Sequence, residues 1–391
     1  MVLNDFYDVA VVGGGAAGVS SAAAAVDACA NRVALIESSS RLGGAVSAAM
    51  HRCLCGLYSR EPGDPLDTLN SGGQREIVAN MVRHDPAGVV ARQMGKTWVL
   101  EFTPAAWRAS LDQVCSRGSI DRLMNCRVIG LHRNETRIEA LQMQGIVPQW
   151  LQVGAVIDCT GAGALIQLAG SDVSLPADET GRRMLGGFSI CLAGLKGNPQ
   201  TLRLQIPYAL TQAVASGHLP REARFTLFQP GPGDGQGVCK LAVNPQSSGD
   251  EVRALAERVM QHLRHEIPEF SEAQIQETSP SVVARDGLRL HGSVILTEED
   301  VLSARKYGQT AVHAWWPIER WDQNDGPTYA YPPAGDHYDI PSGALQSASV
   351  KNLFAAGICV SATAGAAASL RASGICLATG DAAGRLAAGV L

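Results

Sequence analysis

The stretch DVAVVGGGAAG, residues 8–18, decides the fold of this chain. Its apolar run predicts a buried parallel strand over residues 8–12, and the glycines that follow open an alanine-rich helix. Gly13 permits a tight turn, Gly15 lets a pyrophosphate approach the backbone, and Gly18 allows the helix to pack closely on the strand. The stretch therefore predicts the first part of a nucleotide-binding βαβ unit.

The residues after the turn extend this prediction. Ala16 and Ala17 lie at the start of the helix, where backbone N–H groups and the helix dipole attract negative charge. A second apolar stretch, RVALIE at residues 32–37, ends at Glu37. A carboxylate at the end of this strand can accept both ribose hydroxyls of an adenosine. Glycines alone would fit an ordinary turn, but strand, glycines, helix, strand and acid together favour a dinucleotide site.

Size and charge narrow the class of protein. The 391 residues, 46% of them hydrophobic, exceed the size at which one hydrophobic core usually stops growing, so two closely packed domains are expected. The formal net charge of −5 and the pI near 6.0 leave no basic excess. This balance argues against nucleic acid or an anionic membrane as a partner.

Cysteine usage and the N-terminal segment indicate a compartment. Ten cysteines are scattered without the dense framework of a small secreted domain, so mostly free thiols in a reducing cytoplasm are expected. Asp5 and Asp8 precede the apolar run VAVV, and no Lys or Arg occurs before Arg32, so a secretory signal lacks its charged start. The apolar segment 16–30 is interrupted by Asp27 and falls short of the ~20 residues of a membrane span. We expect a cytoplasmic protein without a transmembrane helix.

Further elements follow along the chain. FTPAAWRASLDQVCSRGS, residues 102–119, predicts a helix that Gly118 terminates. The stretches CRVIGLHR, RIEALQMQ and WLQVGAVID predict three short strands within residues 126–158. After Gly170 the composition becomes more polar, which marks a candidate substrate domain.

Two capping boxes predict helix starts in that later region. Ser248-x-x-Glu251 precedes a clearly amphipathic helix, and Thr297-x-x-Asp300 precedes a second helix over LTEEDVLSARKYG.

Four segments resemble the glutathione-reductase-like FAD proteins. ESSSRLGGAV, residues 37–46, resembles their extended fingerprint, and LQVGAVIDCTGAG, residues 151–163, resembles their Ala-Thr-Gly motif. KNLFAAGICVSATAG, residues 351–365, resembles the final strand of the flavin domain, and residues 369–389 resemble the helix aimed at the isoalloxazine. Besides the glycine turn and Glu37, the resemblance implies FAD contacts from Ser38, Arg41, Gly43, Gly44, the backbone of Val128 at the adenine, Thr160, Gly161, Gly357, Ile358, Ser369 and Leu370.

Over most of its length the chain resembles the broad family of FAD-dependent oxidoreductases. The resemblance implies FAD as the cofactor and leaves the substrate open, because kinship of fold does not transfer chemistry. Two positions depart from the family pattern. Ile358 stands where the family tends to have arginine, and Ser342-Gly343 stands where it tends to have Tyr-Arg. The chain therefore lacks two cationic groups that are typical near the flavin.

The implied fold is α/β, a glutathione-reductase-like FAD-binding Rossmann domain with an inserted α+β substrate domain. The FAD-binding domain would comprise residues 1–50, 102–170 and 340–391, and the substrate or cap domain would comprise residues 51–101 and 171–339. No second Gly-x-Gly-x-x-Gly follows a strand, so a separate NAD(P)H domain is not expected. Electrons would pass through substrate, oxygen, a quinone or a partner, and the electron acceptor stays unknown.

The expected function is hydride transfer between a small organic substrate and the flavin. A flavin-dependent monooxygenase, a cyclase or isomerase, and a flavoprotein maturation enzyme acting on a partner protein are the alternatives. The chain could also assemble as a homo-oligomer.

The stretch HRCLCG offers three reactive side chains. If it is extended, His51, Cys53 and Cys55 share one face. They could pack in the core, form a strained redox disulfide, or bind metal, although no second pair at metal spacing follows and no metal site is predicted. By the resemblance, this segment runs toward the isoalloxazine, so His51 or Cys55 could exchange a proton beside it.

Other residues could complete an active site. Arg371 precedes the last helix and could favour negative charge on a reduced flavin, or it could be a surface or phosphate-contacting residue. Arg285 and Arg289 flank an expected bend, and salt bridging is expected for both. An aromatic cluster could line a pocket for an aromatic substrate, or it could be core: Trp315, Trp316, Trp321, Tyr329, Tyr331 and Tyr338.

Overall fold

The computed structural model describes residues 6–145, 149–170, 172, 174–175, 183–231 and 233–389. Seven strands within these ranges form the main sheet, in the order β6-β2-β1-β9-β8-β7, and β20 pairs with β9. They are β1 (Phe6–Val12), β2 (Val33–Glu37), β6 (Ile120–Met124), β7 (Arg127–Arg133), β8 (Ile138–Gln144), β9 (Trp150–Asp158) and β20 (Leu353–Ala355). Strands β6, β2, β1, β9 and β20 are parallel, whereas β7 and β8 join antiparallel. The result is a mixed α/β fold with a Rossmann-like sheet.

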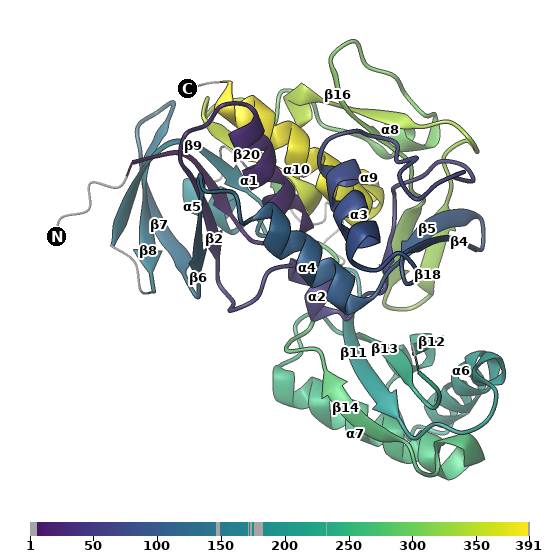
Figure 1. Cartoon of the computed structure of the whole chain (residues 1–391). Coiled ribbons are helices and arrows are strands. Elements are labelled where there is room, and N and C mark those ends of the chain that lie inside the picture. Colours follow the sequence, from purple (N-terminus) through teal and green to yellow (C-terminus); the bar gives the residue numbers. More distant parts are fainter. Residues whose placement is uncertain are drawn as a thin grey trace.

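Helices α1 (Ala16–Asp27) and α10 (Ser373–Ala388) lie side by side over this sheet (Figure 1). Close contact between them depends on small residues. A Cβ added to Gly380 would lie 2.2 Å from the Ala17 carbonyl oxygen, and one on Gly384 would lie 2.3 Å from that of Ser21. The start and the end of the chain are thereby packed together beside the glycine turn.

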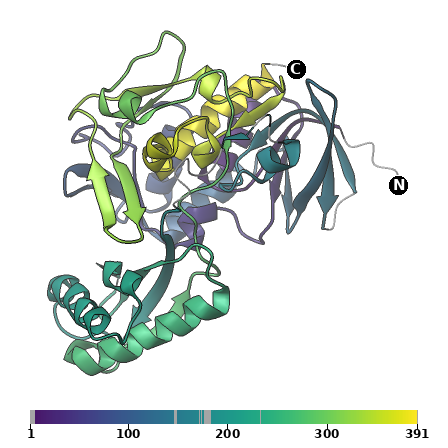
Figure 2. The ribbon, with the colours of Figure 1, turned by 180° about the vertical axis from the view of Figure 1, so that it is seen from behind.

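A second sheet projects from the main body in both views (Figures 1 and 2). Its strand order is β12-β13-β11-β14. The strands are β11 (Gly186–Ala193), β12 (Leu227–Pro230), β13 (Gly237–Val243) and β14 (Gln274–Thr278), and helices α6 (Pro199–Ala215) and α7 (Gly249–Glu266) pack on them. This sheet has a hydrophobic core of its own, in which Phe188, Val259 and Met260 are fully buried.

Smaller elements complete the main body. They are α2 (Gly44–Ala48), β3 (Cys53–Leu54), α3 (Gly73–His84), β4 (Val90–Met94), β5 (Thr97–Glu101), α4 (Pro104–Val114), α5 (Ala164–Ala169), β10 (Ser174–Leu175), β15 (Arg289–Leu290), α8 (Glu298–Leu302), β16 (Thr310–Ala314), β17 (Ile318–Asp322), β18 (Gly326–Ala330), β19 (Tyr338–Pro341) and α9 (Ala364–Leu370). Leu54, Ile77 and Met81, from the segment 51–101, share one core with Val9 and Val19 of β1 and α1. This packing differs from the expected assignment of that segment to the substrate domain.

The helix starts predicted from the sequence agree with the structure better than the predicted helix ends. Both capping boxes are confirmed, with reciprocal side-chain and backbone bonds at the starts of α7 and α8. Helix α4 ends at Val114, before Gly118, and α8 ends at Leu302, well short of the predicted length. No helix within the described part of the chain is both long enough and apolar enough to cross a membrane.

Candidate functional site

The glycine turn has the geometry of a phosphate-binding loop. Gly13 has φ +107°, and a Cβ added to it would lie 2.4 Å from the Cys159 carbonyl oxygen. A Cβ on Gly18 would lie 1.7 Å from the Gly13 oxygen, so the helix start touches the turn. Beside Gly15, by contrast, the nearest atom to an added Cβ is the Cα of Gly44 at 3.6 Å. The backbone is therefore packed at two glycines and open at the third, where a pyrophosphate would approach.

Glu37 lies at the end of β2 and faces this turn. Its carboxylate accepts hydrogen bonds from the backbone N–H groups of Gly14 and Ser39, each at 2.7 Å. The next predicted segment joins the same place, because the Gly43 N–H donates to the Gly14 oxygen at 2.8 Å. Ser38 and Arg41 lie on the exposed loop between them.

Three other predicted segments meet at the carboxyl ends of the parallel strands. The Cys126 N–H donates to the backbone carbonyl oxygen of Glu37 at 3.0 Å, which brings the start of β7, with Val128, beside the end of β2. The Cys159 N–H donates to the Val12 oxygen at 2.8 Å, so the Thr160 turn adjoins Gly13.

The last strand joins them there. A Cβ on Gly161 would lie 3.9 Å from Ile358, and one on Gly357 would lie 3.3 Å from Ala17.

Two predicted FAD contacts have buried side chains. The Ser369 hydroxyl donates to the Trp316 oxygen at 2.6 Å and bonds the Tyr338 hydroxyl at 2.8 Å. Leu370, the last residue of α9, is buried in a hydrophobic core. Both residues are almost fully buried, so neither side chain is free to contact a cofactor in this structure.

The residues present fit an FAD. The open backbone at Gly15, the adjacent pair Gly43-Gly44 and the carboxylate of Glu37 form a cradle. Its backbone N–H donors suit a pyrophosphate, and its carboxylate acceptor suits the hydroxyls of a ribose.

The stretch with His51 lies against the start of α10. The Cys55 N–H donates to the Ser373 hydroxyl at 3.1 Å, and its carbonyl accepts from the Gly374 N–H at 2.7 Å. The second sheet also reaches this place, because the Ser189 hydroxyl donates to the Ala49 oxygen at 2.8 Å. His51 therefore lies where the last helix, the N-terminal segment and the second sheet come together.

Three cations lie near enough to His51 to act on its charge, and we name Lys240, Arg285 and Arg371 the cationic cluster. The positive charge of Lys240, followed by burial and then by the two arginines, holds the pKa of His51 well below its usual value. Burial likewise lowers the pKa of Lys240 and brings that of Arg285 to about 9. Each of these four side chains keeps part of its surface exposed. The imidazole is thus neutral at physiological pH.

One carboxylate partly balances this cluster. Glu319 on β17 lies 3.4 Å from Arg371 and accepts hydrogen bonds from the indole N–H groups of Trp321, at 2.7 Å, and Trp316, at 3.4 Å. Burial would raise the pKa of Glu319, but Arg371, the indoles and Arg285 together lower it. Three cations against one carboxylate leave an excess of positive charge.

The three arginines that were singled out in the sequence have different surroundings. Arg285 stacks on Trp321, with its Cζ 4.0 Å from the ring centroid, and a Cβ on Gly187 would lie 3.4 Å from its guanidinium. Arg371 donates to the Glu319 carbonyl oxygen at 3.0 Å, yet its Nε is buried without a hydrogen-bond partner in the described part of the chain. Arg289 is buried and donates to the Ala362 oxygen.

The thiols of the stretch are protonated. Burial, and then Glu101, raises the pKa of Cys53 to about 11, while burial, and then Cys53, raises that of Cys55 further. Both are free cysteines. A thiolate role at neutral pH is disfavoured, because the thiolate is the nucleophile and the metal ligand.

Sequence reasoning missed Lys240 and Glu319. A weak signal for each exists: Lys240 interrupts the otherwise apolar strand GVCKLAV, and Glu319 stands among tryptophans in WWPIERW. The expected aromatic pocket is largely buried structure, since Trp316 and Trp321 hold Glu319 and Tyr338 lies in the core.

Comparison with known proteins gives three findings. A family model described as FAD dependent oxidoreductase matches residues 8–391. No curated protein matches the chain. Among solved structures, a geranylgeranyl bacteriochlorophyll reductase-like protein from Thermoplasma acidophilum is similar at 11% identity and a TM-score of 0.48, covering 98% of this chain and 77% of that one. L-proline dehydrogenase from P. horikoshii is similar at 12% identity and a TM-score of 0.46, covering 98% and 92%.

Proposed function

The chain belongs to the family of FAD dependent oxidoreductases, and from this premise we propose that it transfers a hydride between FAD and a small organic anion. The observation that carries the proposal is the cationic cluster around His51, at the start of α10. Hydride chemistry belongs to the flavin once it is bound, and the protein supplies binding, orientation and charge.

The anion would bind to Lys240 and Arg285. Arg371 already has Glu319 as a partner, whereas no salt bridge of Lys240 or Arg285 occurs among the described residues. Partly buried cations without a counter-ion are costly, and a carboxylate or phosphate on the substrate would offset that cost. Charge complementarity would also orient the reacting carbon.

His51 would accept the proton that accompanies oxidation. A substrate that loses a hydride from carbon must also lose a proton from the neighbouring oxygen or nitrogen to form a double bond. The neutral imidazole is in the correct state to take it. Binding of an anion at Lys240 would weaken the positive field on His51 and raise the pKa of the imidazole, which favours that transfer.

We also propose the finer fold assignment, a glutathione-reductase-like FAD domain with an inserted substrate domain. The separate core of β11 to β14, α6 and α7 supports an inserted part within residues 171–339. The shared core of Leu54 and Ile77 with α1 supports placing residues 51–101 with the FAD-binding part.

Anaerobic flavin reduction tests the proposal. The FAD-loaded protein is mixed with a panel of hydroxy acids and amino acids and with the neutral amide of each acid. We expect at least one acid to bleach the oxidised flavin, and its amide to react roughly 10²-fold more slowly. Amides that react as fast as their acids would overturn the anion assignment.

Variants separate the roles. His51→Asn should slow reduction by roughly 10²-fold or more and leave FAD content unchanged. Cys53→Ala and Cys55→Ala serve as matched controls on the same stretch, and they should retain the rate within a few-fold because both thiols are protonated. Equal loss in all three variants would point to packing and contradict a proton-transfer role for His51.

A further inference from the structure

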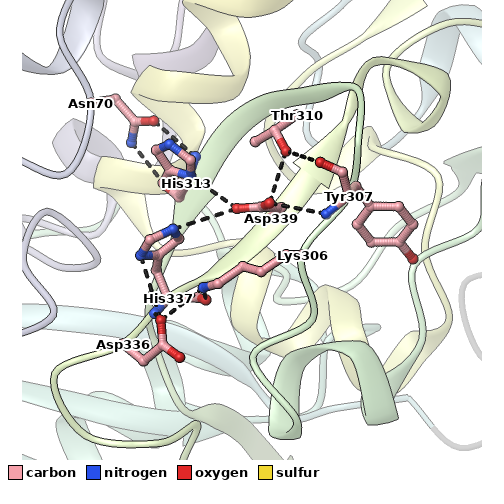
Figure 3. Close-up of polar contacts among 8 residues, drawn as sticks. All are labelled: Asn70, Lys306, Tyr307, Thr310, His313, Asp336, His337 and Asp339. Atoms are coloured by element: carbon pink, nitrogen blue, oxygen red, sulfur yellow. Dashed lines mark hydrogen bonds and ion pairs between the residues drawn. The ribbon is translucent and has the colours of Figure 1, made fainter.

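A pair of strands outside the flavin site brings two histidines and an aspartate together. In the antiparallel pair β16 and β19, His313 lies directly opposite Asp339. His337 lies two residues before Asp339, and strand side chains alternate, so its side chain extends from the same face. Tyr338, between them, points the other way and is fully buried. Figure 3 shows the three polar side chains converging.

The spacing of their polar atoms suits a tetrahedral metal ion. The His313 Nδ1 lies 2.9 Å from the Asp339 Oδ1, and the His337 Nε2 lies 3.6 Å from the same oxygen. One ligand atom from each residue falls within 4.8 Å of the others. Bonds of about 2.0–2.2 Å at tetrahedral angles place ligand atoms roughly 3.4 Å apart. The two distances to the Asp339 Oδ1 are therefore within roughly half an ångström of this spacing, and rotation of the partly exposed imidazoles would adjust the separation between the two histidines.

The surrounding residues hold the ligands in place. The second oxygen of Asp339 accepts from the Thr310 hydroxyl at 2.8 Å and from the Tyr307 N–H at 3.0 Å. Asn70 bonds both backbone groups of His313, at 2.9 Å and 2.8 Å. Such outer partners orient ligands in metal sites.

The site is also open to solvent on one side. The Asp339 side chain is 5% exposed, while those of His313 and His337 are 45% and 31% exposed. Asp336 lies 3.7 Å from the His337 Nδ1, on the ring nitrogen that faces away from Asp339. An ion can enter from the histidine side, and a water can fill the remaining position.

We propose that His313, His337 and Asp339 bind one divalent transition-metal ion of the zinc class. Two imidazoles and one carboxylate are a donor set for such ions, and neither Ca²⁺ nor Mg²⁺ favours nitrogen ligands. No metal site is predicted from the sequence, because these residues form no known metal-binding motif and come together only in the fold. The proposal does not rest on the proposed function.

Cobalt titration of the untagged, FAD-loaded protein tests the site. We expect one Co²⁺ per chain, with absorption bands of nitrogen and oxygen ligation and no thiolate charge-transfer band. His337→Gln should weaken binding by more than the roughly 10- to 100-fold that loss of an outer-shell partner costs. Its side chain is partly exposed, so the variant should keep its FAD content and fold.

His132→Gln is the matched control. His132 forms an exposed pair with Glu139 at 3.0 Å and does not belong to the proposed metal site. The His132→Gln variant should bind Co²⁺ as tightly as the parent protein does. The His313→Gln variant should lose binding to the same extent as His337→Gln. Binding that survives both His313→Gln and His337→Gln, absence of binding in the parent protein, or a spectrum with thiolate bands would overturn the proposal.

Discussion

Single residues set the chemistry around His51, whose pKa is held low chiefly by Lys240. Lys240→Met removes the largest cause, so the pKa of His51 should rise toward its usual value. If deprotonated His51 accepts the proton, the rate rises with pH through that pKa. The acid limb of flavin reduction should therefore move to higher pH in the variant, as measured by rapid-mixing kinetics across a pH series.

Lys196→Met is the control for that experiment. Lys196 forms an exposed ion pair with Glu272 at 2.6 Å. It is not one of the cations that lower the pKa of His51. Its profile should match that of the parent protein. An acid limb that stays in place in Lys240→Met would remove His51 from the proton-transfer role.

The pair Arg371 and Glu319 sets charge near the start of α10. Arg371→Met should lower the flavin reduction potential because it removes positive charge that would stabilise the reduced anion, and Glu319→Gln should raise it. A shift of about 30 mV corresponds to about 1.4 kcal/mol for two electrons. Potentiometric titration of both variants gives the signs. Shifts in the same direction would place this pair outside the electrostatic reach of the flavin.

Among the elements, the turn between β1 and α1 allows a sharp comparison of two glycines. Gly15→Val puts a side chain into open space beside the backbone, so the variant should fold and fail to retain FAD. Gly18→Val would place its Cβ 1.7 Å from the Gly13 oxygen and should prevent folding. Circular dichroism and flavin content distinguish the outcomes. A folded Gly15→Val that keeps FAD would contradict the assigned cradle.

Local elements could be predicted from the sequence, and contacts across the chain could not. The strand, glycines and helix of residues 8–27 obey short-range rules, as do the capping boxes at Ser248 and Thr297. Lys240 acts on His51 from β13, and Glu319 pairs with Arg371 from β17, which belongs to a different sheet. Because these residues lie far apart in the sequence, their spacing does not predict that they come together. Helix α8 ends at Leu302, and the chain turns at Ala304, whose φ is +52°. Beyond this turn Arg305 pairs with Asp300.

The main body and the second sheet have separate hydrophobic cores, and these should unfold separately. Met260→Ala, in the core of the second sheet, should destabilise that core by about 2–5 kcal/mol while FAD content stays normal. All six tryptophans lie outside residues 186–278, and of these Trp321 packs against Ala242 of β13, so their fluorescence reports chiefly the main body. Circular dichroism should therefore begin to change at lower denaturant than tryptophan fluorescence. Coincident transitions in the variant would show one cooperative unit instead.

Lys240 is the member of the cationic cluster that the second sheet contributes, while Arg285 and Arg371 come from segments of the main body. Substrate preference and flavin binding are then determined by different segments of the chain, which can be exchanged separately. A chimera that receives residues 186–278 from another family member would take over that relative's counterpart of Lys240 and its choice of anion, yet keep the dinucleotide cradle of its own N-terminus. Descent with exchange of this one segment would let new substrates arise on an unchanged flavin-binding scaffold.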